Sequence, residues 1–298
     1  MRILVTGVSG QVGGALLERL RDHDVIRGDR ATLDLAQVER IGEVLDRLSP
    51  DLIINPAAYT AVDKAEDERD LATLVNAKAP EALARWTATK QVPLVHFSTD
   101  YVFDGTGTRP WREDDTTGPL SVYGASKLAG EDAIRAAGGS YLIVRTSWVY
   151  AAKGTNFLRT IARVARERKE LRIVADQIGA PTSAALIAEA VIRMIGGDIE
   201  IFRERCALAN GIVNLAASGE ASWYDFAVAI VNGLKLRGVT LMVEKVLPIT
   251  SEEYPTHAKR PGNSRLDLSR LQHLFGITPS SWRDALAAEL DRVAEEMR

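Results

Sequence analysis

The stretch RILVTGVSGQVG, residues 2–13, joins a short apolar run to three spaced glycines, Gly7, Gly10 and Gly13. The apolar run predicts a buried strand, and the apolar spacing of Val12 and Leu16 just beyond it predicts a helix. Glycines between a strand and a helix allow a tight turn and let backbone N–H groups approach a pyrophosphate at the helix N-terminus. The spacing is GxxGxxG rather than GxGxxG, so the stretch by itself is also compatible with an ordinary glycine turn.

The same alternation of short apolar runs and amphipathic segments continues through the first half of the chain. Alternating strands and helices favour an α/β fold with a parallel sheet covered on both faces, which we expect to be a Rossmann-type doubly wound sheet. The predicted strands are Arg2–Thr6, Asp24–Gly28, Asp51–Ala57, Val92–Ser98 and Tyr141–Arg145. The predicted helices are Gln11–Arg21, Val38–Leu48 with Asp34 as its cap, Leu71–Lys90 and Lys127–Ala137.

Beyond about residue 150 the alternation is less regular. We therefore expect residues 1–150 to form a cofactor-binding Rossmann domain and residues 151–298 to form mainly a smaller substrate-binding lobe, with some later elements returning to the sheet. The expected elements of this second part are helices at Thr155–Lys169, Thr182–Gly196, Ser222–Leu236 and Ser281–Arg298, and a strand at Gly211–Leu215.

Composition narrows the classes of protein. The chain has 298 residues, 46% of them hydrophobic and 26% charged, with a formal net charge of −3. This balance is typical of a globular protein and disfavours nucleic acid as the main partner. One cysteine, Cys206, excludes an internal disulfide. No run approaches the ~20 apolar residues of a membrane span, so we expect a soluble cytoplasmic protein without a membrane partner.

Histidines give no sign of a metal site. The four histidines are scattered without metal-ligand spacing, so no catalytic metal is expected. His96 lies inside a predicted strand and is interpreted as a hydrogen-bonded core residue.

A tyrosine and a lysine four positions apart, Tyr123 and Lys127, open the helix between the fourth and fifth predicted strands. This spacing places both on one helix face, where an ammonium group would lower the pKa of the phenol toward a range useful for acid catalysis. Ser98 and Thr99 end the fourth strand, at the sheet edge where α/β proteins bind ligands. A hydroxyl there would reach a carbonyl held near Tyr123.

Two neighbouring residues bear on the cofactor. Asp29 follows the second strand, where an acid accepts hydrogen bonds from an adenosine ribose. Arg30 comes next and would pair with a 2′-phosphate. The two point to NADH and to NADPH respectively, so both cofactors remain candidates.

Together these motifs resemble the extended short-chain dehydrogenase/reductases and, more narrowly, the dTDP-4-dehydrorhamnose reductase family. The narrower resemblance rests on phrases spread from about residue 5 to about residue 266. They are GQVG at 10–13, AYTAVDKAE at 58–66, STDYVF at 98–103, VYG at 122–124, KLAGE at 127–131, RTSWVY at 145–150, DQIGAPT at 176–182 and RP with NSRL at 260–266.

The resemblance implies reduction of the C4 ketone of dTDP-4-dehydro-β-L-rhamnose to dTDP-L-rhamnose by NADPH or NADH, with a dTDP-sugar as the partner. The implied catalytic residues are Thr99, Tyr123 and Lys127, and the implied sugar contacts are Thr99, Asp100, Trp148 and Arg260. With the glycine loop and Arg30, the expected cofactor contacts are Gly7, Gly10, Gln11, Val12, Gly13, Asp29, Arg30, Asp34, Leu35, Ala58, Tyr59, Thr60, Tyr123 and Lys127.

Several relatives in that family form homodimers, which makes a homodimer a candidate assembly here. The family's magnesium-linked mode uses a glutamate on the first helix, and this chain has Ala15 at the matching position. The resemblance therefore does not extend to that mode.

Three alternatives stay open at this level: a reductase of another dTDP-4-keto-6-deoxyhexose, a nucleotide-sugar epimerase or dehydratase, and a non-catalytic NADP-binding regulatory subunit. Epimerases of the superfamily often have an aromatic residue where this chain has Gln11. The presence of Thr99, Tyr123 and Lys127 together argues against a non-catalytic subunit.

Overall fold

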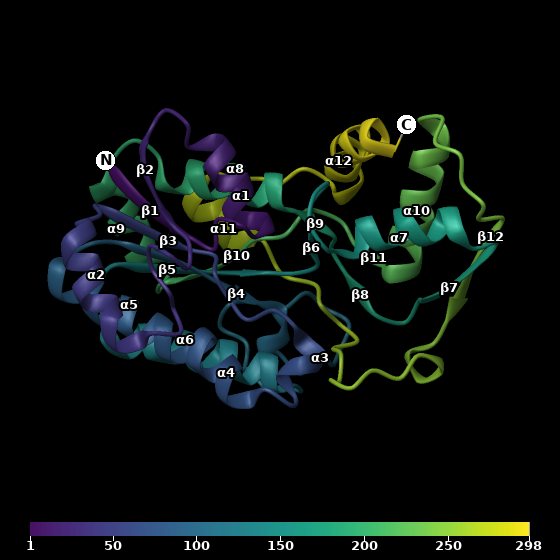
Figure 1. The fold of residues 1–298 in the computed structure, drawn as a ribbon. Coiled ribbons are helices and arrows are strands. Elements are labelled where there is room, and N and C mark those ends of the chain that lie inside the picture. Colours follow the sequence, from purple (N-terminus) through teal and green to yellow (C-terminus); the bar gives the residue numbers. More distant parts are fainter. Residues whose placement is uncertain (298) are drawn as a thin grey trace.

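A computed structural model describes residues 1–297 and has a six-stranded parallel sheet at its centre (Figure 1). The strand order is β10-β5-β4-β3-β1-β2. The chain places β2 on one side of β1 and then adds the later strands on the other side, as in a doubly wound fold. The strands are β1 (Arg2–Thr6), β2 (Asp24–Gly28), β3 (Leu52–Asn55), β4 (Leu94–Thr99), β5 (Tyr141–Thr146) and β10 (Ile212–Asn214). The expected α/β class and sheet type are confirmed.

Helices cover both faces of this sheet (Figure 1). Successive strand residues point to opposite faces, so Leu4 and Ile53 enter one core while Val5 and Ile54 enter the other. The first core is completed by α2 (Ile41–Leu48), α5 (Ala79–Lys90) and α6 (Val122–Ala137). The second is completed by α1 (Gln11–Arg19), α8 (Ala184–Ile195), α9 (Ile199–Leu208) and α11 (Ser269–Phe275).

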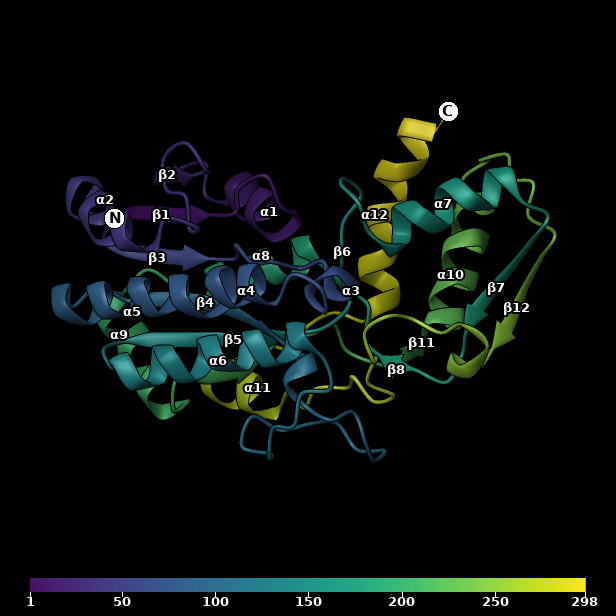
Figure 2. The ribbon, with the colours of Figure 1, turned by 60° about the horizontal axis from the view of Figure 1, so that its bottom comes forward.

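A second lobe lies beyond the carboxyl ends of the strands (Figure 2). It has its own core around Tyr150, Phe226 and Leu286. Its elements are α7 (Phe157–Glu167), β7 (Glu170–Val174), α10 (Trp223–Leu236), β12 (Lys245–Ile249) and α12 (Trp282–Met297), with β7 and β12 forming a parallel ribbon.

The chain passes more than once between the two lobes. After α7 and β7 it returns to the sheet, where α8 packs on α1 and β10 pairs with β5. Late elements therefore complete the central sheet, as the sequence allowed. The assignment of residues 1–150 to cofactor binding and of residues 151–298 mainly to substrate binding stays a prediction.

Short elements connect these parts. They are η1 (Val38–Arg40), α3 (Val62–Ala65), α4 (Arg69–Thr73), the π-helical turn η2 (Leu74–Lys78), η3 (Asp100–Val102), β6 (Val149–Tyr150), β8 (Ile178–Gly179), β9 (Thr182–Ser183), β11 (Ala221–Ser222) and η4 (Ser251–Glu253). Within residues 1–297 no helix has the length and apolar character needed to cross a membrane.

Proline accounts for two differences between the expected and observed strand limits. β3 ends at Asn55 rather than Ala57 because Pro56 cannot donate a ladder hydrogen bond, and β4 starts after Pro93 for the same reason. The expected cap was wrong as well. The helical segment starts at Val38 after Gln37, while Asp34 closes a local turn by accepting from the Ala36 amide at 3.0 Å.

Candidate active site

One large cavity lies between the carboxyl ends of the sheet strands and the second lobe, with a volume of about 2210 Å³. Drug-sized ligands occupy pockets of roughly 300–1,000 Å³, so this space has room for two large ligands. It brings together every expected site residue: Gly7, Gly10, Gln11, Val12, Gly13, Asp29, Arg30, Asp34, Leu35, Ala58, Tyr59, Thr60, Thr99, Asp100, Tyr123, Lys127, Trp148 and Arg260.

The glycine loop is shaped by backbone contacts that exclude a side chain. Gly7 has φ 55°, a left-handed conformation, and a Cβ at Gly13 would lie only 2.2 Å from the Gly7 carbonyl oxygen. Gly10 is the N-cap of α1 and, in the described chain, no side chain caps it. The first amides of α1 are therefore available to an anion, which fits the pyrophosphate of a dinucleotide.

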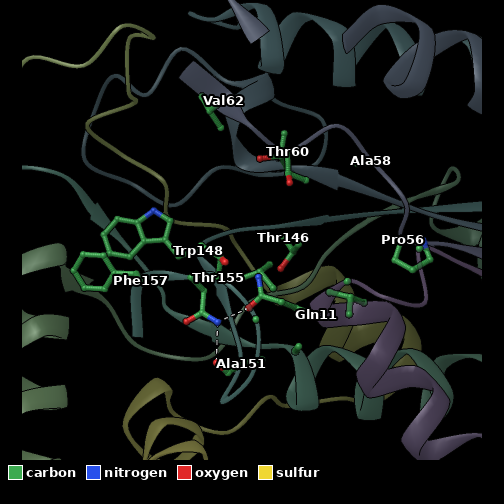
Figure 3. A pocket seen from close by; sticks show the side chains of 18 of the residues that line it. Gln11, Pro56, Ala58, Thr60, Val62, Thr146, Trp148, Ala151, Thr155 and Phe157 are labelled. Carbon is green, nitrogen blue, oxygen red and sulfur yellow. Dashed lines mark hydrogen bonds between the residues drawn. The ribbon is translucent and has the colours of Figure 1, made fainter. Parts of the chain in front are cut away.

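The glycine loop is also tied to the second lobe. The Gln11 side-chain oxygen accepts a hydrogen bond from Asn156 Nδ2 at 2.9 Å, and Asn156 Nδ2 also reaches the Ala151 carbonyl at 2.8 Å. Figure 3 shows Gln11 facing the loop that carries Ala151 and Thr155. Asn156, which is the N-cap of α7, was not singled out in the sequence. It makes Gln11 a contact between the lobes as well as part of the cavity wall.

Asp29 and Arg30 lie together at the end of β2, and both are exposed. Asp29 Oδ1 accepts from the Thr32 amide at 2.8 Å, and the hydrogen bonds from Thr32 lower the pKa of the carboxyl group. The structure thus places an anionic and a cationic group side by side at this end of the cavity.

The wall formed by residues 58–60 is held by a side chain that the sequence reasoning missed, Asn76. Its amide accepts from the Tyr59 N–H at 2.8 Å and donates to the Tyr59 carbonyl at 3.0 Å and to Ser126 Oγ at 3.0 Å. Asn76 is fully buried in the π-helical turn η2, a distortion often found at functional sites. Figure 3 shows Ala58 and Thr60 along this side of the cavity.

Thr99, Tyr123 and Lys127 line the cavity at the carboxyl end of the sheet. Thr99 is the last residue of β4, while Tyr123 and Lys127 lie in the first turns of α6, which is capped by Ser121 through the Gly124 amide at 3.2 Å. The Thr99 hydroxyl donates to Asp100 Oδ1 at 3.0 Å. This geometry places a phenol, a hydroxyl and a buried lysine around one region of the cavity.

Burial dominates the protonation of these groups. It raises the pKa of Tyr123, and the contact with the Thr99 hydroxyl opposes this only in part. It also lowers the pKa of Lys127 to about 8, against the opposing charge of Glu131. The sequence suggested that Lys127 lowers the pKa of Tyr123. Here the Lys127 ammonium is directed at His96 instead, and Tyr123 stays a protonated donor at neutral pH.

Three buried polar atoms at the cavity have no hydrogen-bond partner within the described part of the chain. Among residues 1–297, Ser98 Oγ, Asp100 Oδ2 and Thr146 Oγ1 are buried without a hydrogen-bond partner, and all three residues line the cavity. Burial raises the pKa of Asp100 to about 6. Orphaned polar atoms are rare in native proteins, so a bound hydroxylated molecule fits this part of the cavity.

Trp148 has a conformation that is unusual for a bulky residue. Its φ is 48°, in the left-handed region, and its ring stacks on Trp223 with centroids 3.6 Å apart. A Cβ at Gly179 would lie 2.7 Å from the indole, so this glycine makes room for it. Figure 3 shows Trp148 beside Phe157 at the cavity. The supporting Trp223 was not predicted.

Arg260 reaches the cavity from the loop after η4. Its guanidinium donates to Asp63 at 2.6 Å and to the Tyr101 hydroxyl at 3.3 Å, so it bridges the second lobe and the segment after β3. Lys153 also lines the cavity, whereas Arg265 lies outside its lining and pairs with Glu220.

Comparison with known proteins agrees with these features. The family model described as RmlD substrate binding domain matches residues 1–295. The dTDP-4-dehydrorhamnose reductase of Burkholderia thailandensis is 44% identical over 293 residues, covering 96% of this chain and 97% of that protein. The reductase of the same name from Escherichia coli K12 is 41% identical, covering 95% of each chain.

Solved structures agree as well. The dTDP-4-dehydrorhamnose reductase of Clostridium acetobutylicum superposes with a TM-score of 0.88 at 36% identity, covering 98% of this chain and 99% of that one. That of Bacillus anthracis, solved in complex with NADP, gives a TM-score of 0.86 at 34% identity and covers 99% of each chain. The chain belongs to the dTDP-4-dehydrorhamnose reductase family of NAD(P)H-dependent oxidoreductases.

Proposed function

We propose that the protein reduces the C4 ketone of dTDP-4-dehydro-β-L-rhamnose to dTDP-L-rhamnose with NADPH or NADH. The observation that carries this proposal is the meeting of Thr99, Tyr123 and Lys127 in the same cavity as the glycine loop of α1. A hydride donor bound on that loop and a sugar ketone at Thr99 would face each other across it.

In this proposal the bound dinucleotide supplies the hydride, and the chain supplies position and a proton. Tyr123 donates its phenolic proton to the ketone oxygen as charge grows there, a role that suits a phenol whose raised pKa keeps it protonated. Thr99 orients the same oxygen by a hydrogen bond. Lys127, one helical turn from Tyr123, supplies a positive charge on the same helix face that limits the cost of the phenolate that forms.

The other expected residues bind and orient the two ligands. Asp100 Oδ2, buried without a partner, is placed to accept from a sugar hydroxyl, and the Trp148 ring offers a flat face to the sugar. Arg260 carries the positive charge that a diphosphate needs. Gln11 and Val12 present backbone amides to the cofactor, whereas the Gly10 amide donates to the Gly7 carbonyl at 2.9 Å. The remaining cofactor contacts are Gly7, Gly10, Gly13, Asp29, Arg30, Asp34, Leu35, Ala58, Tyr59 and Thr60.

The direct test couples the products of an upstream dehydratase and epimerase to the purified protein. Cofactor absorbance is followed with NADPH and NADH in separate reactions, and the product sugar is identified by NMR. Stoichiometric cofactor consumption with formation of dTDP-L-rhamnose is expected. Binding of NADPH without any ketosugar reduction would refute the proposal and favour a non-catalytic subunit, and turnover without net cofactor use would favour an epimerase.

We further propose that the protein works in the cytoplasm, where its dTDP-sugar substrate and reduced cofactor would be made, and that it forms a homodimer. Light scattering of the purified chain tests the assembly: a mass of twice 32.5 kDa is expected, and a monomer would refute the dimer.

A further inference from the structure

A row of polar side chains crosses the sheet where apolar residues would be expected. Thr6, Asn55 and His96 come from the adjacent strands β1, β3 and β4, and Asn55 and His96 are register partners. All three are fully buried. The Thr6 hydroxyl lies 2.5 Å from Asn55 Oδ1, and Asn55 Nδ2 lies 3.0 Å from His96 Nδ1. The alternation of strand residues directs the row toward the face covered by α6.

Lys127 stands at the end of this row. Its Nζ lies 3.3 Å from His96 Nε2, and its side chain is buried with 2% of its surface exposed. Among residues 1–297 the Nζ atom has no other side-chain hydrogen-bond partner. A buried ammonium without an acceptor is strongly disfavoured, so His96 is the group that makes a charged Lys127 tolerable in this position.

The direction of the hydrogen bonds depends on the charge of Lys127. An ammonium donates to His96 Nε2, so the imidazole must carry its proton on Nδ1 and donate it to the Asn55 amide oxygen. This requires the Asn55 amide to be turned by 180° from the orientation in which Oδ1 faces Thr6 and Nδ2 faces His96. Asn55 then donates through its nitrogen to Thr6 Oγ1. A neutral amine instead accepts from His96 Nε2–H, and Asn55 then keeps the orientation seen in the structure, donating to His96 Nδ1 and accepting from Thr6. In both arrangements Asn55 and His96 are paired along the row, because an amide and a neutral imidazole each have one donor side and one acceptor side.

We propose that His96 is a positioning residue for the reductase reaction: it accepts a hydrogen bond from the Lys127 ammonium and, itself held by Asn55 and Thr6, fixes that group one helical turn from Tyr123 on α6. The proposal rests on the proposed function, in which Lys127 acts beside Tyr123. The row ends at Thr6, which is buried and accepts from the Ala57 amide at 3.3 Å.

The other charged groups around α6 are bonded elsewhere, so His96 is the hydrogen-bond acceptor for the Lys127 ammonium. Glu131 raises the pKa of Lys127, but it is engaged in a two-bond ion pair with Arg145 of β5 at 2.6 and 2.9 Å. Glu66, after α3, accepts from the Val122 amide at 2.9 Å. Asp100 of η3 contacts the Thr99 hydroxyl.

Two further elements that pack on α6, η2 and α5, carry charged side chains that pair with one another. On η2 and α5, Lys78 pairs with Glu81 at 3.2 Å, and Glu81 also pairs with Arg85 at 2.6 Å. Tyr123, the remaining titratable group near Lys127, stays protonated at neutral pH.

The first test reads the tautomer of His96 directly. The chain has four histidines, so ¹⁵N-edited spectra of labelled protein resolve each ring. At pH 7 the His96 ring is expected as the neutral Nδ1–H tautomer, and Lys127→Met should remove that preference. A neutral Nε2–H ring or an imidazolium in the wild type, or an unchanged ring in Lys127→Met, would overturn the proposal. This readout needs no substrate, so it stands even if the proposed reduction is not found.

The second test compares two variants. His96→Phe keeps an aromatic ring but offers no acceptor, whereas His96→Gln places an amide near the position of Nε2. Loss of the acceptor lowers the pKa of Lys127, so the alkaline limb of kcat in His96→Phe should shift down by about one pH unit, with kcat roughly tenfold lower and KM little changed. His96→Gln should restore the wild-type limb.

Thermal unfolding and NADPH titration check that both variants fold and bind cofactor. An unshifted limb in His96→Phe, or a His96→Gln variant shifted as far as His96→Phe, would overturn the positioning role. If His96→Phe does not fold, the His96→Gln profile and the tautomer measurement still decide between the two outcomes.

Discussion

Gly13 and its neighbour Gly14 should respond in opposite ways to the same substitution. A Cβ at Gly13 would lie 2.2 Å from the Gly7 carbonyl oxygen and 2.7 Å from its carbon. Both are backbone atoms of the tight turn and cannot rotate away. The Cβ is about 1.2 Å short of the 3.4 Å at which ordinary contact begins, so Gly13→Ala must displace the loop or the start of α1.

We expect Gly13→Ala to cost about 1–3 kcal/mol of unfolding free energy, the range for overpacked sites, and to lower Tm by roughly 2–4 °C for each kcal/mol. The same displacement moves the amides that would meet the pyrophosphate, so NADPH binding should weaken as well. At Gly14 the nearest atom to a Cβ is the Val8 carbonyl oxygen at 3.8 Å. Gly14→Ala therefore meets no clash and should gain about 0.5–1 kcal/mol from its helical position.

Two measurements check the pair: thermal unfolding without ligand, and titration with NADPH followed by fluorescence. The expected result is a less stable, weakly binding Gly13→Ala and a slightly more stable Gly14→Ala that still binds. Equal stability of the two variants, or normal NADPH affinity in Gly13→Ala, would show that the close approach of α1 to the Gly7 carbonyl is not what shapes the loop.

Three further changes probe the site. Tyr123→Phe should lower kcat by ~10²-fold or more with cofactor binding kept, and turnover near wild type would remove Tyr123 as the acid. Arg260→Ala should raise KM roughly tenfold while kcat changes little, and an unchanged KM would place Arg260 outside the substrate site. Because burial raises the pKa of Asp100 from 3.8 to about 6, folding loses about 3 kcal/mol as pH rises through that window; Asp100→Asn should remove this loss, and parallel pH–stability curves would contradict it.

The central sheet could be predicted from the sequence because its signals are local. Buried parallel strands read as continuous apolar runs, and five such runs gave β1, β2, β3, β4 and β5. The Tyr123 and Lys127 spacing likewise needed only helical geometry. The sixth strand, β10, was predicted as a strand, but its place beside β5 depends on contacts between residues about 70 positions apart in the chain.

The ribbon of β7 and β12 was missed for a physical reason. Its residues are mostly partly exposed or exposed, so neither strand has the long apolar run of a buried strand, and Pro248 interrupts β12. The π-helical turn η2 was read as part of one long helix. Asn76 lies in this distorted turn, and its hydrogen-bond partners Tyr59 and Ser126 lie 17 and 50 positions away in the sequence.

His96 shows what kind of information the sequence lacked. A histidine inside an apolar strand was correctly interpreted as a buried, hydrogen-bonded residue, but its partners decide whether that burial matters for chemistry. One partner, Asn55, is its neighbour across the sheet, and the other, Lys127, comes from a helix packed on that face. A buried polar row that contacted no catalytic residue would affect only how specifically the core packs. Because this one ends at Lys127, one helical turn from Tyr123, changing any member should alter the pH dependence of the reaction as well as the stability of the fold.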